Sequence, residues 1–244
     1  MPSGKWFVIF ACQQKSIPQV NNNGVVGIDV GLKSFAVLSD KTVIENPRFY
    51  RKSQKKLAKL QRRLSRKKPK SKNRDKARIK VARCHEKITN QRNDFLHKET
   101  TKLTNTYSIL KVEDLKICNM LKNHCLAKSI ADASWGTFFN MLSYKVESTG
   151  GEVLKVAPHG TTTKCSRCGF NVPKTLSDRV HCCPNCGLKV DRDFNSANGI
   201  LVKPALSREP RKVTPMEISP LLPLSLERAN EINEIGSPPS LGRG

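Results

Sequence analysis

The sequence lacks any long hydrophobic run. No stretch approaches the roughly 18 apolar residues that a membrane-spanning helix needs, so a transmembrane protein is not expected. The most apolar segment, WFVIFAC at residues 6–12, is short, has no basic region before it and is followed by polar residues. These features argue against a signal peptide, and the segment predicts a β-strand over Trp6–Ala11.

Acidic residues are also scarce. The 244 residues include 44 Lys and Arg but only 20 Asp and Glu, which gives a formal charge of +24. Such an excess draws a protein to polyanions, although it also suits a solvated surface or a membrane-surface patch. The sequence has no lysine-rich amphipathic helix with aromatic anchors, so a membrane partner is disfavoured. Nucleic acid is therefore the polyanion that we expect.

Cysteine is present, but its spacing is not that of a disulfide scaffold. The segments CSRCG and CPNCG form two matching knuckles, which contain Cys165, Cys168, Cys183 and Cys186. Two such turns, 14 residues apart, direct four thiolates to one tetrahedral centre, as Zn²⁺ requires. A redox pair or unliganded thiols fit this repeated spacing less well. Four sulfur ligands leave no open position, so the predicted zinc is structural.

The remaining Cys and nearby His residues are secondary candidates. Cys182 breaks the C-x-x-C spacing and is expected to be a free thiol. His159 and His181 flank the knuckles and could substitute as ligands, but the four thiolates leave no vacancy. The four isolated cysteines are expected to be small core residues; they are Cys12, Cys84, Cys118 and Cys125.

Apolar periodicity predicts an α/β chain, a mixed sheet with helices on its faces. Strands are expected at Val25–Val30, Phe35–Leu38, Thr42–Ile44, 107–115 and 152–157. A seven-residue apolar repeat on both sides of Pro69 predicts a helical hairpin over 50–105, and residues 135–150 predict another helix. Seven of the 14 prolines lie within 204–239, so we expect 204–244 to be a disordered tail.

Most of the excess charge lies on the predicted hairpin. Between Arg51 and Arg92 the sequence has 19 Lys or Arg against two acids, a net charge of +17. We therefore expect this long basic hairpin to supply most of the affinity for nucleic acid.

Three acids lie where sites collect in such sheets, at strand ends and helix starts. Asp29 lies inside an apolar strand, near its end, Glu113 ends another strand, and Asp193 lies at the start of the last predicted helix, DRDFNSANGIL. Each has a simpler explanation: a turn residue, an exposed strand end and a helix N-cap. Together, three carboxylates on a basic protein suit a pair of Mg²⁺ ions that clamp a phosphodiester during cleavage.

Four segments in order carry a family resemblance. GIDVGLKSFAVLSD, ILKVEDLKICNM, CSRCG with CPNCG, and DRDFNSANGI resemble motifs of the OrfB/TnpB family of insertion-sequence transposase-like proteins, relatives of the type V CRISPR effector nucleases. NHCLAKSIADASWGTFFNMLSYKVE is also typical of that family. The resemblance runs from about residue 24 to 200, and the three acids are 84 and 80 residues apart.

The resemblance implies a RuvC nuclease domain with an RNase H-like fold, interrupted by a zinc ribbon. It implies that Asp29, Glu113 and Asp193 are the catalytic acids that hold Mg²⁺, with Asp114 and Asp191 as the neighbours most easily mistaken for them. It further implies a DNA endonuclease directed by a guide RNA from the element's own transcript. Such a protein would work in the prokaryotic cytoplasm, associated with the nucleoid.

The resemblance also divides the chain. Residues 1–20 are expected to be the end of an N-terminal region, 21–160 the nuclease core with its hairpin, 161–190 the zinc ribbon and 191–203 the final RuvC motif. Only 28 residues precede Asp29, so we expect an N-terminally truncated copy. The competing hypothesis is a zinc-ribbon DNA- or RNA-binding remnant without catalysis; a pure scaffold or redox protein has little support.

Overall fold

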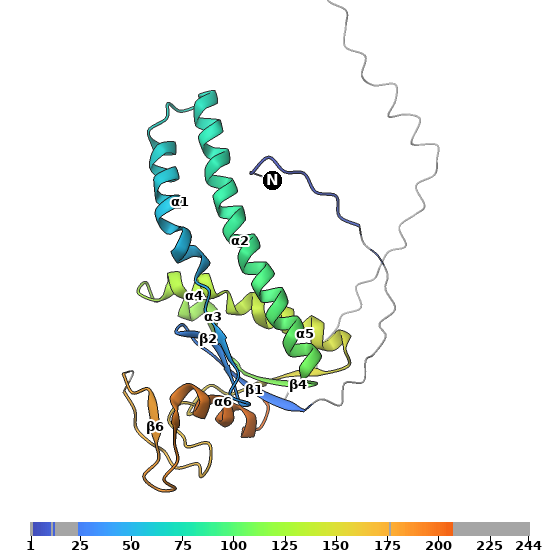
Figure 1. Ribbon diagram of the computed structural model, residues 1–244, viewed down its shortest axis with the longest axis vertical. Coiled ribbons are helices and arrows are strands. Elements are labelled where there is room, and N and C mark those ends of the chain that lie inside the picture. The colour runs from blue at the N-terminus through green and yellow to red at the C-terminus, as the bar shows by residue number, and fades with distance from the viewer. Residues whose placement is uncertain (1, 11, 13–23, 176, 207–244) are drawn as a thin grey trace, which may run out of the picture. The chain divides into compact units, whose positions relative to one another are not determined.

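The structure is a computed structural model that describes residues 2–10, 12, 24–175 and 177–206 (Figure 1). The predicted disordered tail lies outside the described residues from position 207 onward, and so does most of the segment that precedes the first strand. Residues 204–206 have no helix or strand.

A mixed five-stranded sheet forms the centre of the described chain. Its strands are β1 (Val25–Val30), β2 (Ser34–Leu38), β3 (Val43–Glu45), β4 (Ile109–Glu113) and β5 (Glu152–Val156), in the order β3-β2-β1-β4-β5. The first three strands form an antiparallel meander, as the short turns between them predict. β4 pairs parallel to β1, and β5 pairs parallel to β4. The mixed sheet that the sequence predicts is therefore confirmed.

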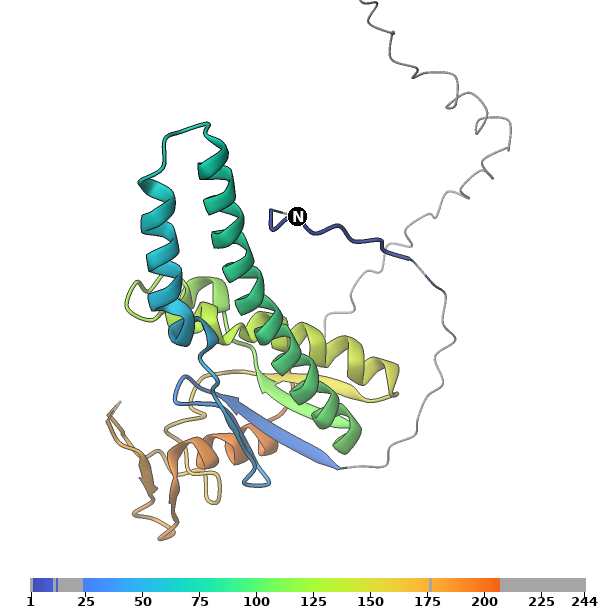
Figure 2. The same ribbon diagram turned by 45° about the horizontal axis from the view of Figure 1, so that its top comes forward.

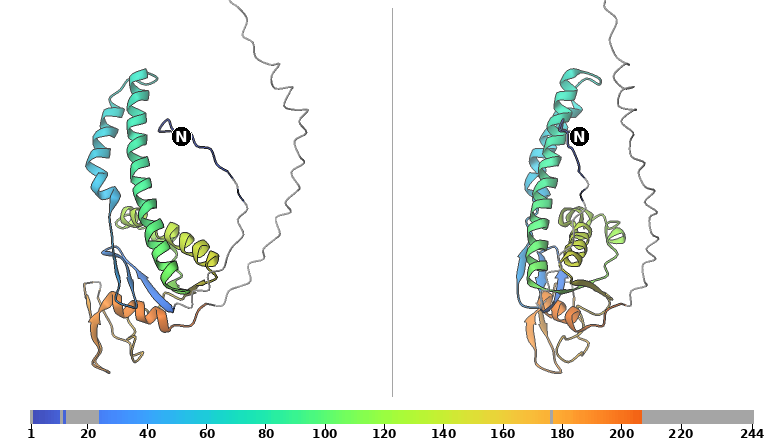
Figure 3. Two further views of the ribbon diagram at one scale, coloured as in Figure 1. Left: turned by 45° about the vertical axis from the view of Figure 1, so that its right-hand side comes forward. Right: turned by 90° about the vertical axis from the view of Figure 1, so that its right-hand side faces the viewer.

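Helices cover both faces of this sheet (Figures 2 and 3). On one face, α2 (Lys72–Thr106) and α5 (Trp135–Ser148) pack on the strands through a cluster of buried apolar residues, in which Phe35 stacks edge-on against Phe95 and Phe138. On the other face lies α6 (Arg192–Val202). Two short helices, α3 (Ile117–Met120) and α4 (Ala127–Ala133), connect β4 to α5.

The predicted hairpin is formed by α1 (Phe49–Ser65) and the first half of α2, with Pro69 in the connection. Figure 1 shows the two helices side by side and projecting away from the sheet. Only a narrow seam joins them, with Leu57, Cys84 and Ile88 buried. Most of the exposed residues of the hairpin are Lys or Arg, so its charge faces solvent.

The base of the hairpin is fixed by a buried carboxylate. Arg48, which precedes α1, has a left-handed backbone (φ 50°) and no side chain that caps the helix. Instead, Asp132 of α4 accepts the Tyr50 backbone N–H at 3.0 Å and pairs with Arg92 of α2 at 3.2 Å. One side chain therefore joins α1, α2 and α4.

The predicted strand at Trp6–Ala11 is wrong for the residues that can be assessed. Residues 6–10 form no strand, and the Trp6 side chain is 95% exposed. A strand needs a neighbour for its backbone hydrogen bonds, and none of the described strands pairs with this segment. The segment is held at its start instead, where the Ser3 carbonyl accepts from Arg83 and Lys5 pairs with Glu86.

A smaller unit of the chain follows β5. It contains the two-stranded antiparallel sheet of β6 (Val180–Cys182) and β7 (Lys189–Asp191). Its loops carry the two cysteine knuckles, and β7 leads directly into α6. Within the described part of the chain, no helix has the length and apolar character needed to cross a membrane.

Candidate active site

The alternation of side chains along β1 places Asp29 on the α6 side of the sheet. Val26 and Ile28 are buried in the cluster beneath α2 and α5. Successive strand residues point to opposite faces, so Gly27 and Asp29 face α6. In β4, Leu110 and Val112 belong to the same cluster, which puts Lys111 and Glu113 on the α6 side too.

Strand pairing brings these two acids together. Ile28 is opposite Val112 in the parallel register of β1 and β4, and the next residue in each strand is the acid. Neighbouring strands lie about 4.8 Å apart. Asp29 and Glu113 are therefore adjacent on the same face, at the same end of the sheet.

The close approach of α6 brings the third acid to this end. A Cβ atom on Gly27 would lie 2.2 Å from the Ala197 carbonyl oxygen, so the absence of a side chain lets the helix rest on β1. Lys111 donates to the Leu201 and Lys203 carbonyls and fixes the far end of α6. Asp193 lies four residues before Ala197 in α6, which is about 6 Å along the helix axis. Asp29 lies two residues after Gly27 in β1, which is about 6.6 Å along the strand in the same direction.

The electrostatics of Asp29 agree with this meeting. Burial, then the negative charges of Glu113 and Asp193, raise the pKa of Asp29 well above its ordinary value, while Arg192 counteracts them. Burial and two nearby negative charges both make ionisation of a carboxyl group less favourable. Such a group is a functional-site candidate, because a bound cation would compensate its charge.

Glu113 is positioned by residues beyond β5. Burial raises its pKa, and a hydrogen bond with Thr161 and the charge of Lys203 oppose that rise. The Lys203 ammonium is itself held by the Ala157 carbonyl at 2.9 Å. Neither Thr161 nor Lys203 carries a recognisable sequence signal, so sequence analysis missed both.

Asp114 and Asp191, the acids nearest in sequence to Glu113 and Asp193, have other contacts. Asp114 pairs with Lys116 at 2.7 Å and Lys155 at 3.0 Å, and these partners lower its pKa. Asp191 caps α6 by accepting the backbone N–H groups of Asp193 and Phe194. The prediction that Asp193 is the N-cap is therefore wrong: it lies in the first turn, where its carboxylate contacts Arg192 at 3.4 Å.

The four predicted thiols form one compact cluster. Their sulfur atoms all lie within 4.8 Å of one another, and two pairs are 3.5 and 3.7 Å apart. A tetrahedron with Zn–S bonds of 2.3 Å has edges of about 3.8 Å, so the cluster matches the size of a zinc site. Among the described residues no set of carboxylates is grouped this tightly.

Each knuckle turns at the glycine that follows its second cysteine. Gly169 and Gly187 adopt positive φ angles of 75° and 71° directly after the second cysteine of each pair. Hydrogen bonds from the Phe170 backbone and the Asn185 side chain lower the pKa of the Cys168 thiol to about 6, whereas burial and the neighbouring thiols raise the pKa of Cys186 to about 12. In this cluster Cys168 is therefore the thiol that ionises first.

The remaining cysteines and histidines are only partly as predicted. Cys84 is buried, as expected for a small core residue, but Cys12, Cys118 and Cys125 are exposed, which contradicts that prediction. Cys12 lies in an irregular segment, and Cys118 and Cys125 lie in and after the short helix α3, which packs against the core through Ile117 and Met120 instead. Cys182 is exposed and outside the cluster, and His181 is buried without a hydrogen-bond partner for either ring nitrogen.

Comparison with known proteins gives this arrangement a family. Residues 9–124 match OrfB_IS605, described as "Probable transposase", and residues 135–200 match the Cas12f1-like TNB domain. The chain is 41% identical over 201 residues to a "Putative RNA-guided DNA endonuclease" of Streptomyces pristinaespiralis, with 82% of this chain aligned. The chain belongs to the OrfB/TnpB family.

A second curated relative and a solved structure are also similar to this chain. "Putative RNA-guided DNA endonuclease InsQ" of Escherichia coli (strain K12) is 37% identical over 215 residues, or 81% of this chain. The fold is similar to that of Cas12f1 in a complex with sgRNA and target DNA, with a TM-score of 0.54 and 19% identity over 72% of this chain and 49% of that one. The chain spans 50% and 54% of the two curated relatives, about half their length.

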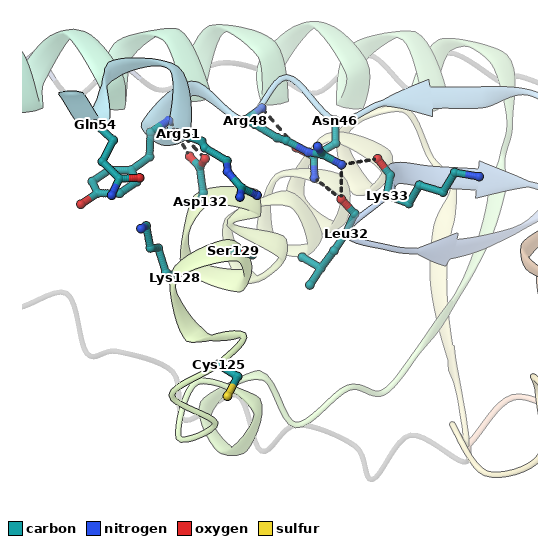
Figure 4. Close-up of a pocket in the computed structure, with 11 residues that line it drawn as sticks. Leu32, Lys33, Asn46, Arg48, Arg51, Gln54, Cys125, Lys128, Ser129 and Asp132 are labelled. Carbon is teal, nitrogen blue, oxygen red and sulfur yellow. Dashed lines mark hydrogen bonds between the residues drawn. The ribbon is translucent and has the colours of Figure 1, made fainter. Parts of the chain in front are cut away.

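This OrfB/TnpB chain also has a basic hollow that sequence analysis missed (Figure 4). The hollow, of about 610 Å³, lies between the β1–β2 turn, the start of α1 and α4. The Arg48 guanidinium donates to the Leu32 and Lys33 carbonyls at 3.3 Å, immediately after the strand that carries Asp29. The residues that line the hollow come from three separate segments of the chain, so no local sequence motif predicts it.

Proposed function

We propose that this chain is a metal-dependent DNA endonuclease of the RuvC type, on an RNase H-like fold, with a structural zinc ribbon. The observation that carries the proposal is the meeting of Asp29, Glu113 and Asp193 on one face at one end of the sheet. The strand order β3-β2-β1-β4-β5, with an antiparallel meander of β1 to β3 beside the parallel strands β4 and β5, supports an RNase H-like core. The family membership supports the same reaction.

The donor set fits Mg²⁺. Hard divalent ions prefer carboxylate oxygens, and Asp29, Glu113 and Asp193 offer them from β1, β4 and α6. When bound, Mg²⁺ would stabilise the attacking and leaving oxygens of phosphodiester cleavage, and Asp29, Glu113 and Asp193 are the residues that would hold it.

The residues around the carboxylates keep them in place. Thr161 and Lys203 hold Glu113, and Arg192 holds Asp193 from the side of the ribbon. Arg192 also donates to the Asp178 carbonyl at 3.0 Å, so it ties the segment before β6 to the first turn of α6. These contacts restrict the rotamers of the acids, which is the usual role of residues behind a metal site.

The ribbon, residues 161–190, is proposed to hold Zn²⁺ through Cys165, Cys168, Cys183 and Cys186. The Asn195 side chain also joins the ribbon to α6. It accepts a hydrogen bond from the Ser166 backbone N–H at 3.0 Å and donates one to the Lys164 carbonyl at 2.9 Å. The zinc would therefore stabilise the segment that packs on α6, without taking part in catalysis.

The partners proposed for this chain are DNA and a guide RNA. The names of the relatives support a guide RNA, and the basic hairpin provides a surface for either polyanion. The expected division into residues 1–20, 21–160, 161–190 and 191–203 remains part of the proposal.

The test is cleavage of single- and double-stranded DNA by the full chain, with and without the transcript of its own element. We expect Mg²⁺-dependent cleavage that Asp29→Ala abolishes. Equal cleavage by Asp29→Ala would remove the nuclease assignment. Binding of DNA with no cleavage under any of these conditions would favour the non-catalytic remnant.

A further inference from the structure

The segment that carries the four thiols begins and ends beside the proposed metal-binding acids. At its start, Thr161 forms a hydrogen bond with Glu113, and Cys165 follows four residues later. At its end, β7 leads from the second knuckle into α6, where the Arg192 guanidinium contacts the Asp193 carboxylate at 3.4 Å. Two of the three acids therefore contact the two ends of one thiol-bearing segment.

Arg192 connects the ribbon to Asp193. Its backbone N–H donates to the Arg179 carbonyl at 2.8 Å, and its guanidinium donates to the Asp178 carbonyl at 3.0 Å. The same guanidinium contacts Asp193, and its positive charge also acts on Asp29. Because the Arg192 side chain is only 15% exposed, these contacts determine where the guanidinium lies. The position of Asp193 therefore depends on where the ribbon holds the two carbonyls.

The two carbonyls that hold Arg192 directly precede β6, and β6 depends on the second knuckle. β6 and β7 have three residues each and pair antiparallel, with Val180 opposite Asp191. The knuckle closes the turn between them, where the Cys183 backbone N–H donates to the Leu188 carbonyl at 2.9 Å. A two-stranded hairpin is marginally stable in water on its own, so a strand pair this short needs a metal on the thiols to stay formed.

The first knuckle reaches α6 by a separate contact. The Asn195 side chain is fully buried and bonds to Ser166 and Lys164, on either side of Cys165. Asn195 lies two residues after Asp193 in the same turn of α6. Both knuckles are thus fixed to the turn of the helix that carries the third acid.

We infer that Arg192 is a positioning residue that couples the thiol cluster to the carboxylates. With a metal on the four thiols, β6 and β7 stay paired and the Asp178 and Arg179 carbonyls hold Arg192. The guanidinium then holds Asp193 in the orientation that accepts a divalent ion. With the thiols empty, the strand pair opens and the Asp193 carboxylate can rotate away. The inference rests on the proposed function and adds that the ribbon controls the affinity of the carboxylates for divalent ions.

Mn²⁺ titration of the full chain, followed by electron paramagnetic resonance, tests the coupling without cleavage. The zinc-loaded protein is compared with protein from which a chelator has removed the zinc, with the thiols kept reduced. Coupled sites commonly change each other's affinity by 5- to 150-fold, and we expect zinc removal to weaken Mn²⁺ binding by about 10-fold. Equal Mn²⁺ affinity of the two forms would overturn the inference.

The reverse measurement gives a second readout, because coupling between two binding sites is reciprocal. Saturating Mg²⁺ should raise the affinity of the thiol cluster for zinc by the same factor, as measured by competition with a chromophoric chelator. Na⁺ at equal ionic strength is the control and should leave the zinc affinity unchanged. Equal effects of Mg²⁺ and Na⁺ would contradict the coupling.

A matched pair of variants tests whether Arg192 carries the coupling. Arg192→Lys keeps the charge, but a single ammonium lacks the planar fork that holds the Asp178 carbonyl and Asp193 together. In the zinc-loaded protein it should weaken Mn²⁺ binding by about 10-fold, and zinc removal should then change the affinity by less than about twofold. Arg179→Lys makes the same change at an exposed residue that contacts Arg192 through its backbone carbonyl, and it should behave as the wild type.

The outcomes distinguish a positioning role from simpler ones and from failure of the nuclease proposal. Wild-type Mn²⁺ affinity in Arg192→Lys would show that only the charge matters, and independent, additive effects of the substitution and of zinc removal would reject coupling through this residue. Mn²⁺ binding that Glu113→Gln abolishes, but that zinc removal and Arg192→Lys leave unchanged, would keep the carboxylate site and reject the coupling. Absence of Mn²⁺ binding in the zinc-loaded wild type would reject the carboxylate site, and this inference with it.

Discussion

Replacing Gly27 with Ala should damage both stability and catalysis, because α6 rests on this position. The new Cβ atom would lie 2.2 Å from the Ala197 carbonyl oxygen and 2.8 Å from the Leu201 backbone nitrogen. Non-bonded contacts are most favourable near 3.5 Å, so the helix must move by roughly 1 Å. Both obstructing atoms belong to the backbone of one helix, and a rotamer change cannot relieve the contact.

The expected cost follows from that movement. Overpacking a well-packed site costs about 1–3 kcal/mol, and we expect the upper end here. For a protein of this size, 3 kcal/mol lowers Tm by roughly 6–12 °C. Because α6 carries Asp193, a displacement of about 1 Å should also reduce the cleavage rate by around 10²-fold.

Urea unfolding followed by circular dichroism measures the first effect, and single-turnover DNA cleavage measures the second. Gly24→Ala is the matched control, since its Cβ atom would meet nothing within 4 Å, and it should change stability by less than about 0.5 kcal/mol. If Gly27→Ala unfolds at the same urea concentration as the wild type, the packing of α6 on β1 described above is incorrect.

Three further predictions concern the thiols, the hairpin and Asp29. Cys168→Ser should lower both bound zinc and Tm, because the metal supplies much of the folding free energy of a small site, whereas Cys182→Ser, outside the cluster, should change neither. If the hairpin neutralises 6–10 phosphates, affinity for DNA should fall by ~10³–10⁵ between 50 and 200 mM salt; a flat response would exclude that role. The raised pKa of Asp29 means that its stabilising contribution is complete below its ordinary pKa and is lost as pH rises through the raised value. Asp29→Asn should therefore make the metal-free protein more stable at neutral pH and flatten the fall in stability above pH 4; an unchanged pH profile of thermal unfolding would contradict this.

The elements with strong apolar periodicity could be predicted from sequence. The strand at Val25–Val30 was predicted with the bounds that the structure gives it, and the helical hairpin was predicted to within a residue at each end. Both patterns are local, because a buried face repeats every second residue in a strand and every third or fourth in a helix. The apolar run at residues 6–10 shows the limit of this reasoning, since a strand also needs a partner.

The site could be predicted only in part. Motifs gave Asp29, Glu113 and Asp193, and the structure brings them to one end of the sheet. The N-cap assignment failed because Asp191 and Asp193 are both suitable caps in sequence, and only the backbone of α6 distinguishes them. Asp132, Thr161 and Lys203 were missed because each acts through a contact with a segment remote in sequence, which no single-chain pattern encodes.

The central claim is that Asp29, Glu113 and Asp193 bind a shared pair of divalent ions. Titration of the full chain with Mn²⁺, followed by electron paramagnetic resonance, tests it without relying on cleavage. We predict that Glu113→Gln loses Mn²⁺ binding while Asp114→Asn, the adjacent acid with its own lysine partners, binds as the wild type does. Wild-type Mn²⁺ binding by Glu113→Gln would contradict the account.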